Sequence, residues 1–450
     1  MAARPILASA LLCCAFVAQA SPRTDPTTGR AVFTGATTPH PTSILLNPAA
    51  LGLGFNNELY FALTSALDLY DVDLASAGAV TGAELGAGGS LALILRPGTR
   101  YTVSFDMRMP PPELFPQDHE ELRYFTLGQG QRDFLASIAS TFRVTNRLYF
   151  GATLTHHNTF LRLQYARDTA AAAGEDVVGT PDADERYDVR VNTPYVSTGN
   201  LKVTLGVLLR LYNEVWLGVS YHTPPGFDIQ AELEGGVEIE RAPRDGGGRL
   251  VGDSVVEVSY PASVDAELSA RLPQFLELHV GGRWEDLSRM QAYDVRVAGS
   301  QIYLLGIPEW QLRTRGLEDS FALWGGVDQV DTGQPFRFGG RVGFETSAVP
   351  PSRMTPLTMS PTSLTLDLGA QIRLGPWIAQ LSYGLQYFPS VSVDESAFDA
   401  QHNRDCIASD FDYTTRGCEA VRNGYAIANG DGTYARMLHS LRLGFRYELP

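Results

Sequence analysis

The 450-residue chain has no apolar run that reaches the ~20 residues needed by a transmembrane helix. It also has no excess of basic residues, because 35 Lys and Arg stand against 50 Asp and Glu, which gives a net charge of −15. A chain without a basic face cannot neutralise phosphates, so this composition argues against nucleic acid as a partner. Two classes stay open: an exported water-soluble protein, and a membrane barrel, whose strands hydropathy does not reveal.

Cysteine is scarce, with four residues in the chain, and two of them, Cys13 and Cys14, lie in the first twenty positions. These positions have the three parts of a cleaved signal peptide. Arg4 supplies the positive charge, Ile6 to Val17 form the apolar stretch, and Ala18-Gln19-Ala20 is the cleavage site. A signal anchor is the alternative, although the apolar stretch is short. We therefore expect residues 1–20 to be a signal peptide.

The other two cysteines, Cys406 and Cys418, lie in one polar, Asp-rich stretch. In an exported protein, a disulfide that closes a small loop is the natural interpretation. A reactive or metal-binding pair is the alternative, but no Cys-x-x-Cys or His-x-x-Cys spacing supports it. We expect no metal and no other cofactor.

Apolar and polar residues alternate with a period of two along much of the chain, which indicates strands. In residues 436–449, for example, Leu441 and Leu443 share one face, and Arg442 and Arg446 share the other. A soluble β-sandwich also alternates, so further features must decide. The strands are long, near the ~9–11 residues of a tilted bilayer strand. Short connections also alternate with long ones, as in outer-membrane barrels.

Aromatic residues near the strand ends support the membrane interpretation, because interfacial girdles of such barrels are aromatic. These residues are Tyr60, Phe61, Tyr101, Tyr149, Phe150, Tyr212, Trp216, Trp284, Trp377, Tyr387, Phe388 and Tyr447. We predict an all-β fold, a transmembrane antiparallel β-barrel of about 14 strands. The expected strands are 57–70, 88–96, 100–109, 134–144, 147–165, 197–211, 215–232, 274–284, 288–300, 317–330, 335–346, 362–374, 377–389 and 434–449. The expected long loops are 71–87, 110–133, 166–196, 233–273, 301–316, 347–360 and 390–433.

Residues 21–56 precede the first strand and do not alternate, yet they are apolar at Ile44 to Leu46 and Ala49 to Leu53. Apolar side chains need burial, and the nearest volume is the barrel interior, which is wide enough in a barrel of ~14 strands to leak unless it is filled. We therefore expect residues 21–56 to plug a barrel formed by 57–450.

Several segments resemble the FadL/TodX family of outer-membrane transporters. Residues 29–51, "GRAVFTGATTPHPTSILLNPAAL", look like the N-terminal hatch of the family, with Asn47-Pro48-Ala49 as its local signature. Further along the chain, residues 217–237, 271–284, 337–356 and 429–449 resemble family segments in the same order.

This resemblance implies a 14-stranded barrel, an N-terminal hatch in the lumen and capture of hydrophobic ligands by extracellular loops. It also implies lateral exit beside a kinked third strand, with no ATP, metal or covalent chemistry. The third expected strand, which ends at Pro110-Pro111-Pro112, contains no glycine that would mark a kink.

Three groups of residues are candidates for function. The hatch motif is Asn47, Pro48 and Ala49, for which a purely structural turn is the alternative. The ligand-capture candidates come from two unusually apolar loops: Leu114, Phe115, Ile302, Tyr303, Leu304, Leu305, Ile307 and Trp310. Loop-on-loop packing is the alternative for them.

The third group consists of arginines that strand parity points into the lumen, where a cation could meet a fatty carboxylate: Arg210, Arg283, Arg337, Arg341, Arg373, Arg442 and Arg446. Ion pairs with Glu277, Glu345, Asp367 and Glu448 are the alternative.

We expect a monomeric, non-enzymatic channel in an outer membrane of the Gram-negative type, in contact with outer-membrane lipids. Its ligands would be hydrophobic small molecules such as long-chain fatty acids or aromatic hydrocarbons, which diffuse passively through a hatch-gated barrel. A general porin for small polar solutes and a non-transporting adhesin or receptor are the alternatives.

Overall fold

The computed structural model describes residues 32–449 except 76, 115–118, 170–184, 228–230, 273–274, 300–301, 303–308, 395 and 397–429. The expected signal peptide, residues 21–31, and the cysteines Cys406 and Cys418 lie outside the described residues. No helix within the described ranges is long and apolar enough to cross a membrane.

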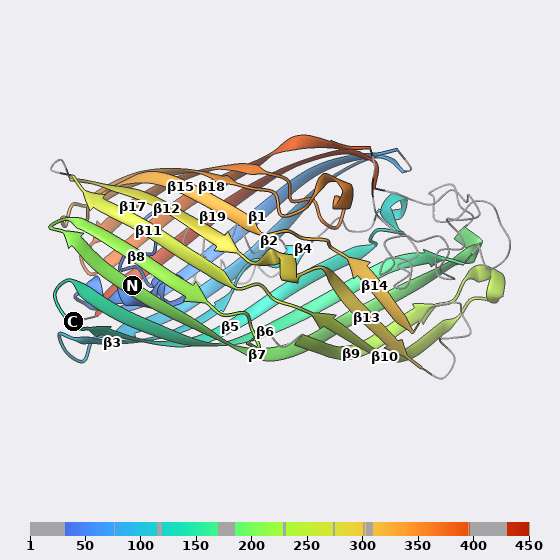
Figure 1. The fold of residues 1–450 in the computed structure, drawn as a ribbon, viewed down its shortest axis with the longest axis horizontal. Helices are drawn as coiled ribbons and strands as arrows, with labels where there is room; N and C mark the ends of the chain where they lie inside the picture. The colour runs from blue at the N-terminus through green and yellow to red at the C-terminus, as the bar shows by residue number, and fades with distance from the viewer. Residues whose placement is uncertain are drawn as a thin grey trace, which may run out of the picture.

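Fourteen antiparallel strands close into a barrel, because β1 pairs with β2 on one side and with β19 on the other. The strands run obliquely along the long axis of the molecule (Figure 1). They are β1 (Asn57–Leu74), β2 (Gly78–Leu95), β3 (Tyr101–Met109), β5 (Gly128–Arg143), β6 (Leu148–Asp168), β7 (Asp188–Tyr212), β8 (Val215–His222), β11 (Ser263–Arg271), β12 (Leu276–Glu285), β15 (Ser320–Gln329), β16 (Phe336–Glu345), β17 (Ser363–Leu374), β18 (Trp377–Val393) and β19 (Gly432–Leu449).

Five further strands lie outside the closed ring: β4 (Glu113–Leu114), β9 (Ala231–Glu240), β10 (Arg249–Val258), β13 (Ala292–Ala298) and β14 (Trp310–Thr314). The short helices of the described chain are α2 (Ser43–Leu46), η2 (Pro48–Leu53), η3 (Glu120–Leu122), η5 (Glu185–Tyr187), η6 (Pro243–Asp245), η7 (Leu287–Arg289) and η9 (Pro351–Arg353). One end of the barrel, which we call the turn end, carries tight connections such as 375–376, and the opposite end is the loop end.

The predicted barrel of 14 strands is confirmed, but two strand assignments were wrong. Strand β11 occupies residues that were expected to be loop, between β8 and β12 in the ring. The expected barrel strand 288–300 is instead β13, which pairs with β10 and β14 outside the ring. The expected loop 71–87 is also wrong, because β1 and β2 continue as a hairpin that pairs Leu74 with Gly78.

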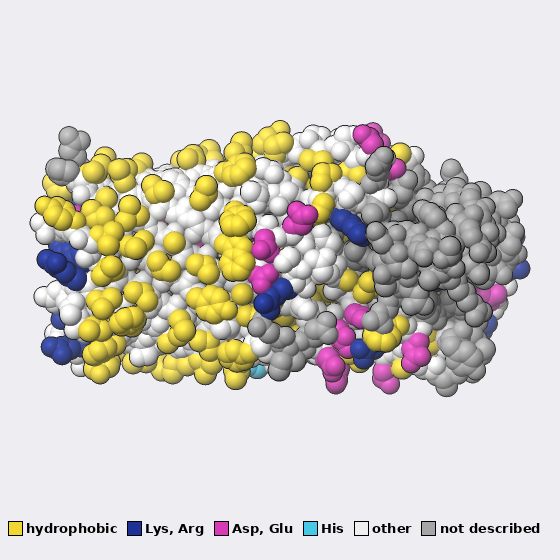
Figure 2. All heavy atoms as spheres, viewed as in Figure 1, with side chains coloured by type: hydrophobic (Ala, Val, Ile, Leu, Met, Phe, Trp, Pro, Cys, Tyr) yellow, Lys and Arg dark blue, Asp and Glu magenta, His cyan; other side chains and the backbone are white. Residues whose placement is uncertain are grey.

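The outer surface of the turn-end half is covered by exposed apolar side chains, which Figure 2 shows as a broad yellow band. Members of this band include Leu59, Phe105, Leu205, Phe338 and Leu443. Water-soluble monomers rarely expose an apolar surface of this extent, and a band around a barrel is the lipid-facing surface of a transmembrane protein. The fold is therefore that of a transmembrane β-barrel.

The polarity of the strands inverts beyond this band. Along β1, the outward residues change from apolar ones such as Leu63 to Asp71 and Asp73, while the inward residues change to Val72 and Leu74. The loop-end half is thus built like a soluble β-protein, with charge outside and an apolar core inside. This core includes Tyr70, Val72, Leu163, Tyr165, Val191, Leu233, Val256 and Val295. Near residue 70 of β1 the apolar residues change from the outward to the inward face. The predicted strand therefore ends at residue 70, although β1 continues to Leu74.

The prediction that aromatic residues near the strand ends lie on the outer surface, as in an interfacial girdle, holds for residues such as Tyr101, Phe150 and Trp377, which are exposed. It is wrong for Tyr60, Tyr149 and Phe388, which point inward and are buried. Their positions in the strands have inward parity, so their side chains fill the lumen rather than meet the interface.

Candidate functional site: a filled lumen and an internal cavity

Residues 32–54, which we call the plug segment, lie inside the barrel. This location follows from their hydrogen-bond partners, which come from strands all around the ring. The bonds join Phe33 N to Asp328 on β15 (3.1 Å), Thr37 Oγ1 to Glu267 on β11 (2.6 Å), His40 Nε2 to Gln380 on β18 (3.2 Å), Ile44 O to Thr153 on β6 (2.6 Å) and Pro48 O to Thr141 on β5 (2.5 Å). The lumen at this level is therefore occupied by the chain itself.

Asn47 organises the turn at the centre of the plug segment and is 0% exposed. Its side-chain oxygen accepts from Ala49 N (3.1 Å) and so caps η2, whose first residue is Pro48. Its side-chain nitrogen donates to Ala36 O (2.7 Å) and to Val207 O on β7 (3.1 Å). The side chain thus fixes the plug turn and attaches it to the wall.

Three inward glycines on adjacent strands, which we call the glycine cradle, let the plug segment approach the wall closely. A Cβ at Gly206 would lie 2.1 Å from Asn47 Oδ1, and one at Gly151 would lie 2.3 Å from Ala49 N. A Cβ at Gly218 would lie 2.2 Å from Ala36 O. Because no real side chain fits at these distances, the glycines on β6, β7 and β8 define where the turn sits.

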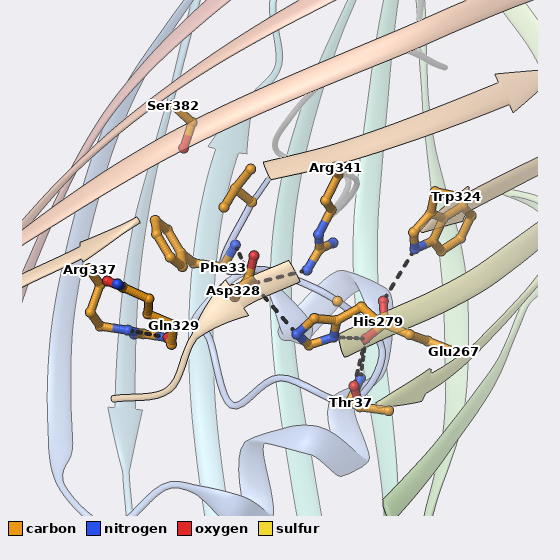
Figure 3. A network of polar contacts seen from close by, with 12 residues as sticks. Phe33, Thr37, Glu267, His279, Trp324, Asp328, Gln329, Arg337, Arg341 and Ser382 are labelled. Atoms are coloured by element: carbon orange, nitrogen blue, oxygen red, sulfur yellow. Dashed lines mark hydrogen bonds and ion pairs between the residues drawn. The ribbon is translucent and has the colours of Figure 1, made fainter. Parts of the chain in front are cut away.

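Two carboxylates hold the start of the plug segment, one on β11 beside the cradle strand β8 and one on β15 (Figure 3). Glu267 accepts from Thr37 Oγ1 at 2.6 Å and from Thr37 N at 3.3 Å, and Asp328 accepts from Phe33 N at 3.1 Å. His279 lies between them, with Nδ1 3.4 Å from Glu267 and Nε2 3.6 Å from Asp328. We call this group the latch. Its bonds to carboxylates are stronger than neutral ones.

His40 connects the plug segment to β18. Burial lowers the pKa of His40 well below its ordinary value, and the nearby Arg442 and Arg446 lower it further. The ring is therefore neutral near pH 7. Its neighbours assign the tautomer: Nδ1 accepts from Thr42 N (3.2 Å), so Nε2 carries the hydrogen and donates to Gln380 Oε1 (3.2 Å).

A cavity of about 230 Å³ lies directly on the loop-end side of the plug segment. Leu45 and Leu46 of the plug form part of its lining, and Pro110 and Pro111, just after β3, form another part. Its other apolar lining residues are Leu135, Pro225, Tyr260, Pro261, Leu287, Met290, Leu317, Val349, Leu357 and Met359. The polar lining residues include Asp133, His157, Lys202, Thr204, His222, Arg283 and Glu285. An amphiphilic lining suits a ligand with an apolar body and a polar end.

The seven predicted lumen arginines all have polar or charged partners. Four of them form ion pairs: Arg283 with Glu285 (2.8 Å), Arg341 with Asp328 (3.4 Å), Arg373 with Glu448 (2.8 Å) and Arg446 with Glu58 (3.7 Å). Arg337 donates to Gln329 O (2.8 Å), and Arg442 donates to Tyr60 Oη. Arg210 contacts Asn213 O and Glu214. The ion-pair alternative fits this arrangement. Glu448, one of the partners proposed from the sequence, pairs with Arg373. Among the seven, only Arg283 lines the cavity.

The two candidate capture loops are described only in part. Ile302 is buried beside Gly252 and Gly299, as the packing alternative expects. Trp310 is 38% exposed on β14 and lies 4.4 Å from the guanidinium of Arg296. Leu114 falls in β4, whereas Phe115, Tyr303, Leu304, Leu305 and Ile307 lie outside the described residues. Their role in capture stays a prediction.

Sequence reasoning missed the latch, the cradle and Lys202. Asp265, Glu267 and Ser269 do alternate with Val264, Ala266 and Leu268. That pattern could have identified β11 and the inward position of Glu267, had the stretch not been assigned to a loop.

The fold and the filled lumen define the class of protein as a plugged transmembrane β-barrel. Neither a protein-family profile nor a curated protein sequence matches the chain. Solved structures do match it. A FadL homologue of Pseudomonas aeruginosa has a TM-score of 0.73 at 13% identity, over 92% of this chain and 95% of that one.

The toluene transporter TodX of P. putida has a TM-score of 0.63 at 11% identity, over 91% of this chain and 94% of that chain. The toluene transporter TbuX of Ralstonia pickettii has a TM-score of 0.59 at 14% identity, over the same shares, 91% and 94%. The chain therefore has the FadL/TodX fold, and the resemblance drawn from the sequence is confirmed at the level of fold.

Proposed function

We propose that this protein is an outer-membrane channel for hydrophobic ligands, which enter from the loop end and pass the barrel by passive diffusion. The observation that carries the proposal is the cavity, whose lining combines apolar and polar residues and which is bounded on one side by Leu45 and Leu46 of the plug segment. A ligand in this cavity contacts the element that blocks its path. The plug segment then acts as the hatch.

The filled lumen distinguishes this function from a general porin. In the described part of the chain, the turn-end half holds the plug segment and the loop-end half holds the apolar core. An open aqueous path for polar solutes requires a lumen that is not packed. Apolar ligands, in contrast, gain free energy by entering such an interior.

Lateral exit beside β3 is part of the proposal. β3 ends at Met109, paired with Gly89, so the ladder from β2 to β3 stops there and leaves residues 78–88 of β2 without a β3 partner. Prolines cannot donate to a ladder, and Pro110 and Pro111 turn instead toward the cavity. Gly88 allows this passage, because a Cβ there would lie 2.5 Å from Pro111 N. Where the family resemblance implies a kinked third strand, β3 instead ends at Met109 and is followed by prolines.

The test is binding of a fluorescent long-chain fatty acid to the full-length mature protein in a non-ionic detergent. Unlabelled fatty acid and toluene serve as competitors. Saturable binding that either competitor displaces supports the proposal and identifies the ligand class. A folded barrel that binds neither compound, but shows a large steady ion conductance in planar bilayers, would replace it with the porin alternative.

A further inference from the structure

The turn end of the barrel is basic along one side. Four hairpins that follow one another around the ring have their turns there: β2–β3, β5–β6, β7–β8 and β11–β12. Their turn-end residues, 95–101, 143–148, 210–215 and 271–277, contain six arginines and two glutamates, in a chain whose net charge is −15. We call these arginines the basic rim: Arg96, Arg100, Arg143, Arg147, Arg210 and Arg271. Figure 2 shows basic side chains at this end, directly beside the apolar band.

Two arginines of the basic rim remain available to a ligand. Three other members have carboxylate partners: Arg96 with Glu58 (3.8 Å), Arg210 with Glu214 (3.9 Å) and Arg271 with Glu214 (3.8 Å). Arg100 and Arg147, in contrast, are exposed, and within the described residues neither guanidinium forms an ion pair or a hydrogen bond. The turns that carry them lie close together, because Arg143 N donates to Arg100 O across β5 and β3 (2.9 Å).

An apolar groove of about 610 Å³ lies on the loop-end side of this rim, on the outer face of β5, β6, β7 and β8. The small side chains of Ser140 and Ala152, which pair in register, hollow out the surface next to the bulky pair Phe142 and Phe150. The other outward side chains of its lining are Leu205, Val207, Val219 and Tyr221. The groove is part of the lipid-facing band, where an acyl chain is the molecule available to fill it.

The rim and the groove meet at Tyr101 and Phe142, whose ring centroids are 5.0 Å apart. Phe142 lines the groove, and Tyr101, which directly follows Arg100, is 55% exposed. On the next hairpin, Phe150 of the groove follows Arg147 by three residues, about 10 Å along an extended strand. Tyrosine at the edge of an apolar band is typical of the level of the lipid headgroups. A lipid headgroup at Arg100 and Arg147 would thus have its acyl chain at the entrance of the groove.

The groove lies directly behind the glycine cradle. Gly151 and Gly206 line it from the outside, and Ala49 and Asn47 of the plug segment contact the same two glycines from the inside. A chain in the groove is therefore separated from the plug turn by a single layer of backbone.

We propose that the basic rim and the groove bind an anionic phospholipid of the membrane leaflet at the turn end, with its headgroup at Arg100 and Arg147 and one acyl chain in the groove. A phospholipid matches both features, because the groove is continuous with the lipid-facing band and the charge of the rim is complementary to a phosphate. Arginine suits this role, since its planar guanidinium donates two parallel hydrogen bonds to phosphate oxygens. Such a site does not depend on which ligand the channel carries.

The experiment measures lipid binding by native mass spectrometry of the full-length protein in non-ionic detergent. The probes are phosphatidylglycerol and phosphatidylcholine with identical acyl chains, which differ in net charge. We expect the wild type to bind phosphatidylglycerol roughly tenfold more tightly, because two arginines at the headgroup level attract an anionic lipid. Arg100→Gln combined with Arg147→Gln should reduce this preference to less than about twofold. Arg132→Gln removes an exposed cation from the loop-end part of β5 and is the control, which should keep the preference.

A second variant tests the acyl chain. Ala152→Phe fills the groove and should weaken the binding of both lipids about tenfold or more, because acyl CH₂ groups lose their apolar contacts there. Ala379→Phe makes the same change on the outer face of β18, away from the groove, and should leave both affinities unchanged. Equal binding of the two lipids to the wild type, an unchanged preference in the double arginine variant, or unchanged affinities in Ala152→Phe would each overturn the proposal.

Discussion

Glu267 of β11 accepts two hydrogen bonds from one residue of the plug segment: the hydroxyl of Thr37 at 2.6 Å and its backbone N–H at 3.3 Å. Glu267 is only 1% exposed, and Trp324 Nε1 donates to its second oxygen at 3.4 Å. Gly35 allows this contact, because a Cβ there would lie 2.3 Å from the carboxylate. The start of the plug is thus fixed to β11, directly beside the glycine cradle, where Glu267 pairs in register with Gly218 of β8.

Weakening the latch should loosen the plug without unfolding the barrel. Hydrogen bonds to charged groups contribute about 1.5–3 kcal/mol, so Glu267→Gln should raise the population of plug-displaced molecules by roughly tenfold or more. Single-channel recordings should then show brief openings that the wild type lacks. Glu214→Gln changes an exposed turn glutamate that does not contact the plug, and recordings like those of the wild type are expected for it. Silent recordings from Glu267→Gln would mean that other contacts hold the plug.

Filling the cradle should displace the plug turn from its seat. A methyl group at Gly206 would overlap Asn47 Oδ1, and overpacking of this kind costs about 1–3 kcal/mol. Gly206→Ala should therefore speed proteolytic cleavage within residues 32–54 of the folded barrel. Gly325→Ala is the control, because its nearest neighbour would be 3.9 Å away. Equal cleavage rates for the two variants would show that the plug tolerates a shift at this contact.

The plug segment should loosen in acid because of His40. Its folded pKa lies well below the ordinary value of about 6.5, so the displaced segment binds the proton more readily than the seated one. The stabilisation is complete above that ordinary pKa and is lost as pH falls toward the folded value. The protection factors of the amides of residues 40–50, which are corrected for the intrinsic pH dependence of hydrogen exchange, should be lower at about pH 5 than at about pH 8.

His40→Gln is the matched variant for this effect, because glutamine can still donate to Gln380 but has no proton to gain. Protection factors that fall in acid equally in His40→Gln and wild type would assign the pH dependence to another group.

The membrane half of the fold follows from the sequence because its pattern is simple: apolar outward, small or polar inward. Residues 362–374 and 434–449 were assigned within a residue or two. The loop-end half was harder, since its strands invert that pattern. In β1 the outward face changes from apolar residues such as Leu63 to Asp71. This change resembles the end of a membrane strand, although the pairing of β1 with β2 continues to Leu74.

The plug could be predicted in outline but not in detail. Asn47-Pro48-Ala49 and the apolar residues around them indicated a buried N-terminal segment. The wall residues that contact the plug are glycines and acids, such as Gly206 and Glu267. Their role depends on which plug atoms lie next to them in the folded barrel, and the sequence does not reveal this. The cavity lining is ordinary by local pattern, because residues such as Leu46, Lys202 and Met359 come together only in the folded barrel.

The central claim, that hydrophobic ligands pass only when the plug segment moves, is tested most directly by locking that segment to the wall. The side chains of Thr37 and Glu267 meet across the plug and the wall at 2.6 Å, so Thr37→Cys and Glu267→Cys place two thiols within reach of a short, reducible crosslinker that reacts with both. The pair belongs in a background with Cys406→Ser and Cys418→Ser, with each single cysteine as a control. Our account predicts that fatty acid or toluene uptake stops when the pair is cross-linked and returns when the crosslinker is reduced. Undiminished uptake through the cross-linked protein would contradict it.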